Sequence, residues 1–481
     1  MIAGIVRVLR NSTLSVVADA VARASNTVLF ILISRRWGAV EGGTYALALT
    51  YALLFTQLSF WGMDQLLTRE VAKDRSVAGK FVGSFILIRV VLSLILFGVM
   101  ALLAGRVLGY APATARVIII VGLGIIPESI SNICQALFIA YEQIKYSTLV
   151  GIVVGALRLA GGGLVLLAGG HVEAIAVLLC VSSVVGLALN LGIVYLRFPR
   201  PSWRPNIQFW LPQIKTAVSF TLIGVFYIIE FQNDTLLLSV FKSEKDVGIY
   251  NAATTILFAL AVLPQAFRAA IFPVMSRLYA AASPTLAVVY EKSFKYLLIT
   301  SLPVAAGLML SAGSVTRLLY RGGFEESATV LRVVIWAFVL LMINVPVARM
   351  MVVANEQNAL AVMQGLSMTL NIGLNVALIP QMGALGAAWA RLGSTSLFII
   401  LGLAYTYWRL YRWNPVWVLM RPLIALAIMI GLGWLLRGLN DLVAALVGLA
   451  GYAIWIWISG VVSQDEWAIL AQVVRPRLRI V

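Results

Sequence analysis

The chain has 481 residues, of which 61% are hydrophobic and only 11% are charged, and its mean hydropathy is +0.97. No soluble domain of this size could cover such a surface with polar groups, so the composition predicts a polytopic membrane protein. Continuous apolar runs exclude the alternating pattern of an outer-membrane barrel. The formal net charge of +17 is typical of nucleic-acid-binding proteins, but the basic residues lie in short loops between apolar runs. We therefore predict the lipid bilayer, and no nucleic acid, as a partner.

The sequence carries no motif for covalent chemistry. It has one histidine and two cysteines, too few for a His/Cys metal cluster, and no Gly-Lys-Ser/Thr loop that would bind ATP phosphates. No nucleophile and base stand paired, and no extramembrane loop is long enough to form a transferase site. We predict a carrier rather than an enzyme, without catalytic residues, metal or cofactor.

Apolar segments long enough to cross a bilayer as helices recur along the whole chain. They predict an all-α protein with about 14 transmembrane helices, at residues 13–34, 44–66, 81–104, 114–140, 146–169, 172–197, 214–240, 249–272, 293–312, 327–353, 358–379, 384–408, 416–436 and 440–461. The basic N-terminus is typical of a signal peptide, but Asp19 and Arg23 interrupt the apolar run that follows, so we expect a retained first helix. Lys and Arg concentrate in alternate loops, which predicts that both termini lie in the cytoplasm.

The longest loop between spans, residues 198–212, divides the chain into two six-helix halves. The expected domains are an N-terminal bundle (1–197), a cytoplasmic interfacial linker (198–212), a C-terminal bundle (213–408), and a pair of accessory helices with a basic tail (409–481). We expect the two bundles to be pseudo-symmetric and to enclose a central cavity.

Two short motifs occupy matching places in the two halves. Gly43-x-Tyr45-x-x-Ala48 reappears as Gly248-x-Tyr250-x-x-Ala253, and Ala174-Ile175-Ala176 reappears as Gly386-Ala387-Ala388. Because each half has an even number of spans, the repeat keeps its orientation in the membrane. The motifs therefore indicate a parallel duplication about an axis along the membrane normal.

The first span carries an unusual polar face formed by Asp19, Arg23 and Asn26, which are spaced by four and three residues. A charge at membrane depth is costly, so this face must contact protein or a water-filled cavity rather than lipid. Two interpretations stay open. The face forms an ion pair that fixes helix packing, or it lines a transport route.

Further polar stripes occur in three other spans. They comprise Tyr227, Glu230, Asn233 and Asp234; then Glu128, Asn132 and Gln135, after a kink expected at Pro127; and then Gln364, Asn371 and Asn375. A buried carboxylate that binds a proton or a cation can bias two conformations. We therefore take Glu230, Asp234, Glu128, Asn371 and Asn375 as candidates for coupling to a proton or sodium gradient. Helix packing through hydrogen bonds is the alternative for the asparagines, and pairing with arginines is the alternative for the acids.

Arginines within or near the spans suit a phosphorylated cargo, because a guanidinium stays charged and offers forked donors. The predicted substrate-binding set is Arg23, Arg89, Arg268 and Arg349, with Asp19 as the partner of Arg23 when the site is empty. A boundary charge is the alternative for Arg349.

Four stretches resemble one family. They are SRRWGAVEGGTYALA (residues 34–48), TREVAKD (68–74), LLYRGGF (318–324) and NIGLNVALIPQMGALGAA (371–388). In this order and spacing they resemble the Wzx-type polysaccharide flippases, such as those for O-antigen, of the multidrug/oligosaccharidyl-lipid/polysaccharide exporter (MOP) superfamily. One departure is Arg321, which stands where the family has glycine after Tyr320.

The resemblance implies a carrier that opens its central cavity alternately to each side of the bacterial cytoplasmic membrane. The implied cargo is an undecaprenyl-pyrophosphate-linked oligosaccharide moving from the inner to the outer leaflet, with a glycan polymerase or ligase as a further partner. A lipid II flippase has the same helix count and remains an alternative. A multidrug antiporter of the superfamily normally stops at twelve helices.

Overall fold

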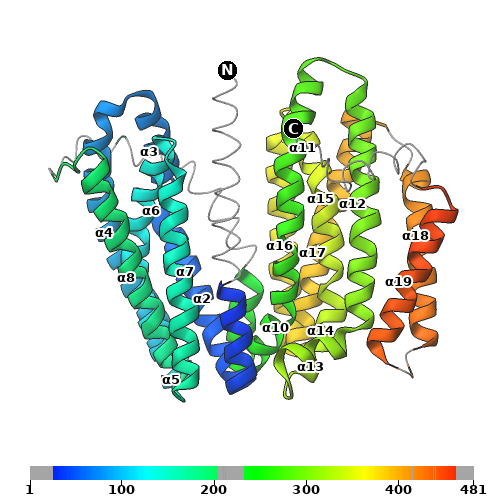
Figure 1. The fold of residues 1–481 in the computed structure, drawn as a ribbon, viewed down its shortest axis with the longest axis horizontal. Helices are drawn as coiled ribbons and strands as arrows, with labels where there is room; N and C mark the ends of the chain where they lie inside the picture. The colour runs from blue at the N-terminus through cyan, green and yellow to red at the C-terminus, as the bar shows by residue number, and fades with distance from the viewer. Residues whose placement is uncertain are drawn as a thin grey trace, which may run out of the picture. The chain divides into compact units, whose positions relative to one another are not determined.

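A computed structural model describes residues 25–203, 210, 212, 232–412, 415–436, 438 and 440–461. Within these ranges the regular structure is helical throughout, and the helices are labelled in Figure 1. Their bounds are α2 Ala39–Phe60, α3 Met63–Lys73, α4 Ala78–Leu102, α5 Pro112–Gly122, α6 Ile125–Ala140, α7 Ile144–Leu167, α8 Val172–Arg197, α10 Glu244–Leu260, α11 Val262–Ala280, α12 Thr285–Leu310, α13 Ala312–Tyr320, α14 Glu325–Val334, α15 Trp336–Val353, α16 Gln357–Met382, α17 Ala384–Tyr405, α18 Pro415–Leu435 and α19 Asp441–Ile458. Residues 25–37 and 232–241 are also helical.

The predicted class, an all-α polytopic membrane protein, is confirmed. Eleven helical segments of the described residues are long and apolar enough to cross a membrane, or twelve if the bent pair α2–α3 is one span. The predicted number of fourteen stays a prediction, because the expected spans 13–34 and 214–240 lie partly outside the described residues.

Two spans are broken at places that hydropathy does not mark. The span expected at 44–66 bends by 44° between α2 and α3, where Trp61 and Gly62 have φ values of 41° and 60°, a conformation that glycine adopts without strain. In the fourth span the helix breaks just before Ile125 rather than at Pro127. Pro127 lies in the first turn of α6, where its missing N–H interrupts no helical hydrogen bond.

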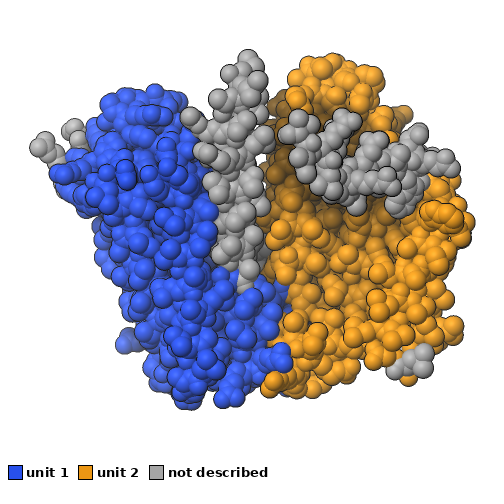
Figure 2. All heavy atoms as spheres, in the orientation of Figure 1, with its two compact units in different colours: residues 1–255, 374–387 blue, residues 256–373, 388–481 orange. Residues whose placement is uncertain are grey.

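The chain divides into two compact units, shown in different colours in Figure 2. Unit 1 contains residues 1–255 and 374–387, and unit 2 contains residues 256–373 and 388–481. The start of α10 belongs to unit 1 because its first turns pack against α2. The predicted domain boundaries stay a prediction.

Within unit 1 the two copies of the repeated glycine motif are in contact with each other. A Cβ placed on Gly43 of α2 would lie 1.8 Å from the carbonyl oxygen of Glu244, and a Cβ on Gly248 of α10 would lie 2.0 Å from that of Ala39. Only glycine permits backbones to approach so closely. The motif therefore serves as the crossing point of two helices.

Candidate functional site

The structure brings some of the predicted site residues together and places others apart. Asp19, Arg23 and Glu230 lie outside the described residues, so their roles stay predictions. The remaining candidates fall into five groups, three in unit 1 and two in unit 2.

Two predicted substrate-binding arginines meet in unit 2. Arg268 on α11 and Arg349 on α15 are close enough for their charges to interact. The Arg349 guanidinium lies over the ring of Phe272, 5.4 Å from the ring centroid, within the limit of about 6 Å for a cation–π contact. Arg268 is exposed and Arg349 is half-buried. Nε of Arg349 has no hydrogen-bond partner, and no carboxylate of the described residues forms an ion pair with either side chain. Two adjacent cations without a counter-charge favour an anionic ligand.

The predicted ion-coupling residue Asp234 forms the centre of a buried polar cluster in unit 1. The hydroxyl of Tyr250 on α10 donates to Oδ2 of Asp234 over 2.5 Å, and Nδ2 of Asn375 on α16 donates to Oδ1 over 2.8 Å. Asp234 is 0% exposed. The two donors give each carboxylate oxygen a hydrogen bond, and these oxygen atoms are of the type that hard cations prefer.

The other asparagine of α16, Asn371, belongs to unit 2. Its Nδ2 donates to Oγ of Ser394 on α17 over 3.3 Å, and both residues are buried. This contact joins two neighbouring helices, as the packing interpretation of the α16 asparagines predicts. Its role in ion coupling stays a prediction.

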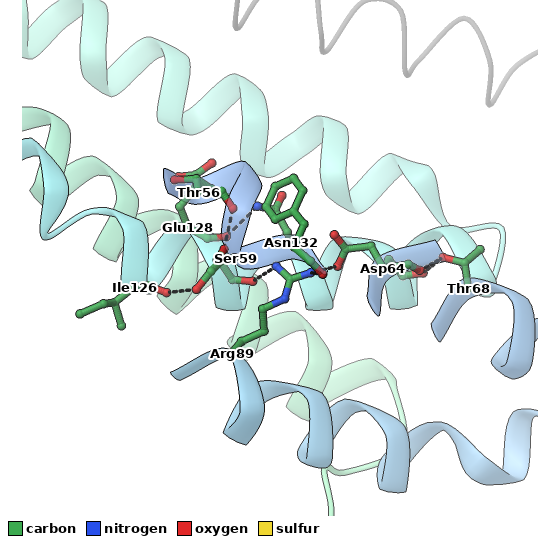
Figure 3. Close-up of polar contacts among 11 residues, drawn as sticks. Thr56, Ser59, Asp64, Thr68, Arg89, Ile126, Glu128 and Asn132 are labelled. Atoms are coloured by element: carbon green, nitrogen blue, oxygen red, sulfur yellow. Dashed lines mark hydrogen bonds and ion pairs between the residues drawn. The ribbon is translucent and has the colours of Figure 1, made fainter. Parts of the chain in front are cut away.

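Arg89, a predicted substrate-binding residue, lies fully buried at the break between α2 and α3. Its Nη2 donates to Oδ1 of Asp64 over 2.8 Å and to the carbonyl oxygen of Phe60 over 2.9 Å, and Nη1 donates to that of Ser129 over 3.3 Å. Figure 3 shows the guanidinium pointing at Asp64 and at the end of α2. The break frees the carbonyl groups at the end of α2, and Arg89 satisfies one of them. These contacts favour a structural role, and a role in cargo binding stays a prediction.

Glu128, a predicted ion-coupling residue, takes no part in the hydrogen bonds of Asp234. It lies near Arg158 instead. Its Oε2 lies 4.0 Å from Nη2 of Arg158 on α7, and the two side chains are 42% and 20% exposed. Arg158 also donates from Nε to Oγ of Ser182 on α8 over 2.8 Å. In Figure 3 the Glu128 carboxylate points away from the Arg89 guanidinium. The carboxylate and Arg158 therefore form a partly exposed ion pair.

Several partners were not among the predicted site residues. Tyr250 could have been found, because a tyrosine in a buried repeated motif needs a partner for its hydroxyl. Asp64 could have been found from the need to neutralise a buried Arg89. Nothing in the spacing of the sequence marks Asn190 of α8, which lines a cavity in unit 1.

Two family models match more than half of the chain each. The model described as "Polysaccharide biosynthesis protein" matches residues 8–279, and the model described as "Lipid II flippase MurJ" matches residues 163–454. Together they cover both repeated motifs and almost all of the described helices.

A curated relative and several solved structures are also similar. "Probable low-salt glycan biosynthesis flippase Agl15" of Haloferax volcanii is 24% identical over 295 residues, which are 60% of this chain and 61% of the relative. The match thus spans about three fifths of that relative's length. A structure of the lipid II flippase MurJ in an inward closed conformation superposes with a TM-score of 0.77 at 14% identity, covering 92% of this chain and 98% of that one. An inward-facing multidrug resistance MATE family transporter gives a TM-score of 0.64 at 15% identity, covering 84% and 95%. At these identities the two structures establish a shared fold.

Proposed function

We propose that this chain, which belongs to the polysaccharide biosynthesis and lipid II flippase families of the MOP superfamily, is a flippase for an undecaprenyl-pyrophosphate-linked oligosaccharide. In this proposal it moves its cargo from the inner to the outer leaflet of the bacterial cytoplasmic membrane by alternating access and breaks no covalent bond. Both termini lie in the cytoplasm, and a glycan polymerase or ligase receives the cargo.

The observation that carries the proposal is the pair Arg268 and Arg349. A pyrophosphate carries more than one negative charge and cannot cross hydrocarbon unaided, so its route must supply fixed positive charge. At an effective dielectric constant of about 20, one ion pair at ~4 Å contributes about 4 kcal/mol before desolvation is subtracted. Two arginines can therefore hold the headgroup without trapping it. Arg23, which Asp19 releases when phosphate arrives, is proposed as a third member of this set.

Transport in proteoliposomes tests the role of these arginines. Arg349→Ala and Arg268→Ala should lower the rate at which an undecaprenyl-pyrophosphate-linked oligosaccharide becomes accessible in the opposite leaflet, by at least about tenfold each, because each removes one charged contact. Arg349→Lys should keep part of the rate, since the charge survives without the fork. Arg277→Ala, at the exposed end of the same helix α11, is the matched control and should behave as the parent protein. Full activity of Arg349→Ala would exclude this pair as the headgroup site.

We also propose that an ion gradient helps to drive the cycle through Asp234. The support is that this carboxylate is buried and is held by Tyr250 and Asn375 from two further helices. A proton or a sodium ion on such a group changes its contacts with both helices at once. It can therefore favour one of two conformations. Consumption of the cargo on the far side of the membrane is the alternative driving force.

Lipid II is the second candidate cargo, and the match of the MurJ family model over residues 163–454 favours it. Both cargoes carry a polyprenyl pyrophosphate, so the arginines do not distinguish them. Competition does distinguish them. Under the first proposal, unlabelled lipid II should compete poorly with the labelled undecaprenyl-pyrophosphate-linked oligosaccharide. If the two cargoes bind equally well, lipid II at equal concentration should halve the amount of labelled cargo that is bound.

A further inference from the structure

Unit 1 contains a polar cavity formed by α6, α7 and α8, whose lining includes the predicted ion-coupling residue Glu128 but not Asp234. Its volume is about 540 Å³, within the range of about 300–1,000 Å³ typical of small-molecule sites. The cavity is lined by Glu128, Ser131 and Asn132 from α6, by Gly151 and Arg158 from α7, and by Asn190 from α8, among others.

Two buried side chains that line this cavity lack hydrogen-bond partners. Asn190 is 1% exposed and Ser131 is 4% exposed. Among the described residues, neither Nδ2 nor Oδ1 of Asn190 has a partner, and neither does Oγ of Ser131. Buried polar groups are normally paired, and an unpaired one needs an explanation. Because both residues line the cavity, a ligand in it that offers donors and acceptors would satisfy them.

The charges of the cavity indicate which class of ligand fits. Glu128 and Arg158 lie 4.0 Å apart, so the lining carries one charge of each sign. A phosphate in the cavity would meet the Glu128 carboxylate, and a cation would meet the Arg158 guanidinium. The other polar groups of the lining are neutral hydroxyls and amides, which can both donate and accept. A neutral ligand rich in hydroxyl groups satisfies all of them.

We infer that this cavity binds a sugar ring of the cargo and so contributes to the choice of glycan. The inference rests on the proposed function and adds a site for the saccharide to the site for the pyrophosphate. Asn190 and Ser131 bind ring hydroxyls, and the Glu128–Arg158 pair supplies charge-assisted hydrogen bonds. Gly151, Gly155 and Gly186 line the cavity as well, and their lack of side chains lets a ring approach the helix backbones.

Filling the cavity provides the first test. A side chain added at Gly151 meets nothing within 4 Å, so Gly151→Leu can fold and places its side chain at the cavity wall. The matched control is Gly163→Leu, on the same helix, which also has open space but does not line the cavity. Two probes are compared by their dissociation constants for the purified full-length protein. They are undecaprenyl pyrophosphate without sugar, and the undecaprenyl-pyrophosphate-linked oligosaccharide extracted from a strain that lacks this protein.

Gly151→Leu should weaken binding of the glycosylated probe by at least about tenfold and leave binding of the sugar-free probe unchanged. Gly163→Leu should leave both unchanged. The inference is overturned if Gly151→Leu binds the glycosylated probe as well as the parent protein does, or if both probes weaken equally. If the parent protein binds neither probe, the proposed function fails, and the sugar site fails with it.

Asn190→Leu provides a second test with a readout that a structural role would not give. Replacing an unpaired buried amide by an apolar side chain of similar size should not lower the unfolding temperature of the empty protein. The same substitution should weaken binding of the glycosylated probe by about tenfold or more. Asn358→Leu, the same substitution at an exposed position of unit 2, should change neither quantity. A lowered unfolding temperature with unchanged binding would assign Asn190 to packing and overturn its role in sugar binding.

Discussion

The two halves predicted from the sequence carry different chemistry at matching positions. Fourteen residues before the repeated glycine, the first half has Leu29 and the second half has Asp234. Leu29 is buried and packs against Gly162 on α7, whereas Asp234 accepts a hydrogen bond from Asn375 on α16. Each contact joins the first helix of a half to its fifth. The second half thus has a buried carboxylate where the first half has an aliphatic side chain.

A second matched contact joins the fifth helix of each half to its sixth. Ser182 and Ser394 each lie eight residues after the first residue of the second repeated motif. Ser182 accepts a hydrogen bond from Arg158 over 2.8 Å, and Ser394 accepts one from Asn371 over 3.3 Å. At this place the first half carries a permanent positive charge and the second half carries a neutral amide.

If the chain is the proposed flippase, this difference predicts that the two halves have different roles in the transport cycle. A leucine cannot change its charge, so the first half cannot respond to protons or cations at the place where we propose that the second half does. Its arginine instead lies beside the polar cavity of α6, α7 and α8. Under the proposed function, cargo recognition is proposed for the cavity of the first half and ion coupling for the carboxylate of the second.

The largest expected effect is on folding, and it comes from a change in the glycine motif that both halves contain. Gly43→Val places a Cβ 1.8 Å from the Glu244 carbonyl oxygen, and because a backbone atom cannot move aside as a side chain can, we expect no folded protein. Gly98→Val on α4, where nothing lies within 4 Å, should fold. Fluorescence-detected size-exclusion chromatography of both variants gives the answer, and a monodisperse Gly43→Val would show that the crossing is not required.

The next effect concerns the stability that the Arg89–Asp64 ion pair gives to the first half. Arg89→Leu leaves Asp64 without its buried partner and should lower the free energy of unfolding by about 3–5 kcal/mol. The double variant Arg89→Leu with Asp64→Leu should recover most of this loss, because no charge is then left unpaired. Thermal unfolding and transport are measured together. If Arg89→Leu keeps its stability and loses transport, Arg89 contacts cargo, as the sequence predicts, and the structural interpretation is wrong.

The smallest of the three effects concerns Asp234, the carboxylate that only the second half has at this position, and it is measured as the response of transport to an ion gradient. Asp234→Asn keeps the shape of the cluster but removes its charge, so it should abolish the rise in transport rate that an imposed proton or sodium gradient causes. Coupling free energies of this kind correspond to about 5- to 150-fold changes. Asp246→Asn, near the start of α10, is the matched control and should respond as the parent protein does. A normal gradient response of Asp234→Asn would remove coupling from the second half.

The sequence predicted the helical class and both repeated motifs, and it named the members of two clusters without pairing them. Arg268 and Arg349 stood in one predicted set, and Asp234 and Asn375 in another, because ionisable and amide groups are conspicuous in apolar runs. Periodicity assigns residues to a face of their own helix, but it does not say which other helix that face meets. Tyr250 and Asp64 were missed for this reason. The break at Trp61 and Gly62 was missed because no proline marks it.

The contact between α2 and α10 has a consequence for the history of the chain. Gly43 lies against the carbonyl group of Glu244, and Gly248 lies against that of Ala39, so each copy of the motif offers the other the same surface that it receives. Such reciprocity defines the interface of a two-fold homodimer, which a duplicated gene would carry into a single chain. Positions away from this crossing can differ between the halves, as Leu29 and Asp234 do. Gly43 and Gly248 both lie at the crossing of α2 and α10. A larger residue at either position would therefore push the two helices apart.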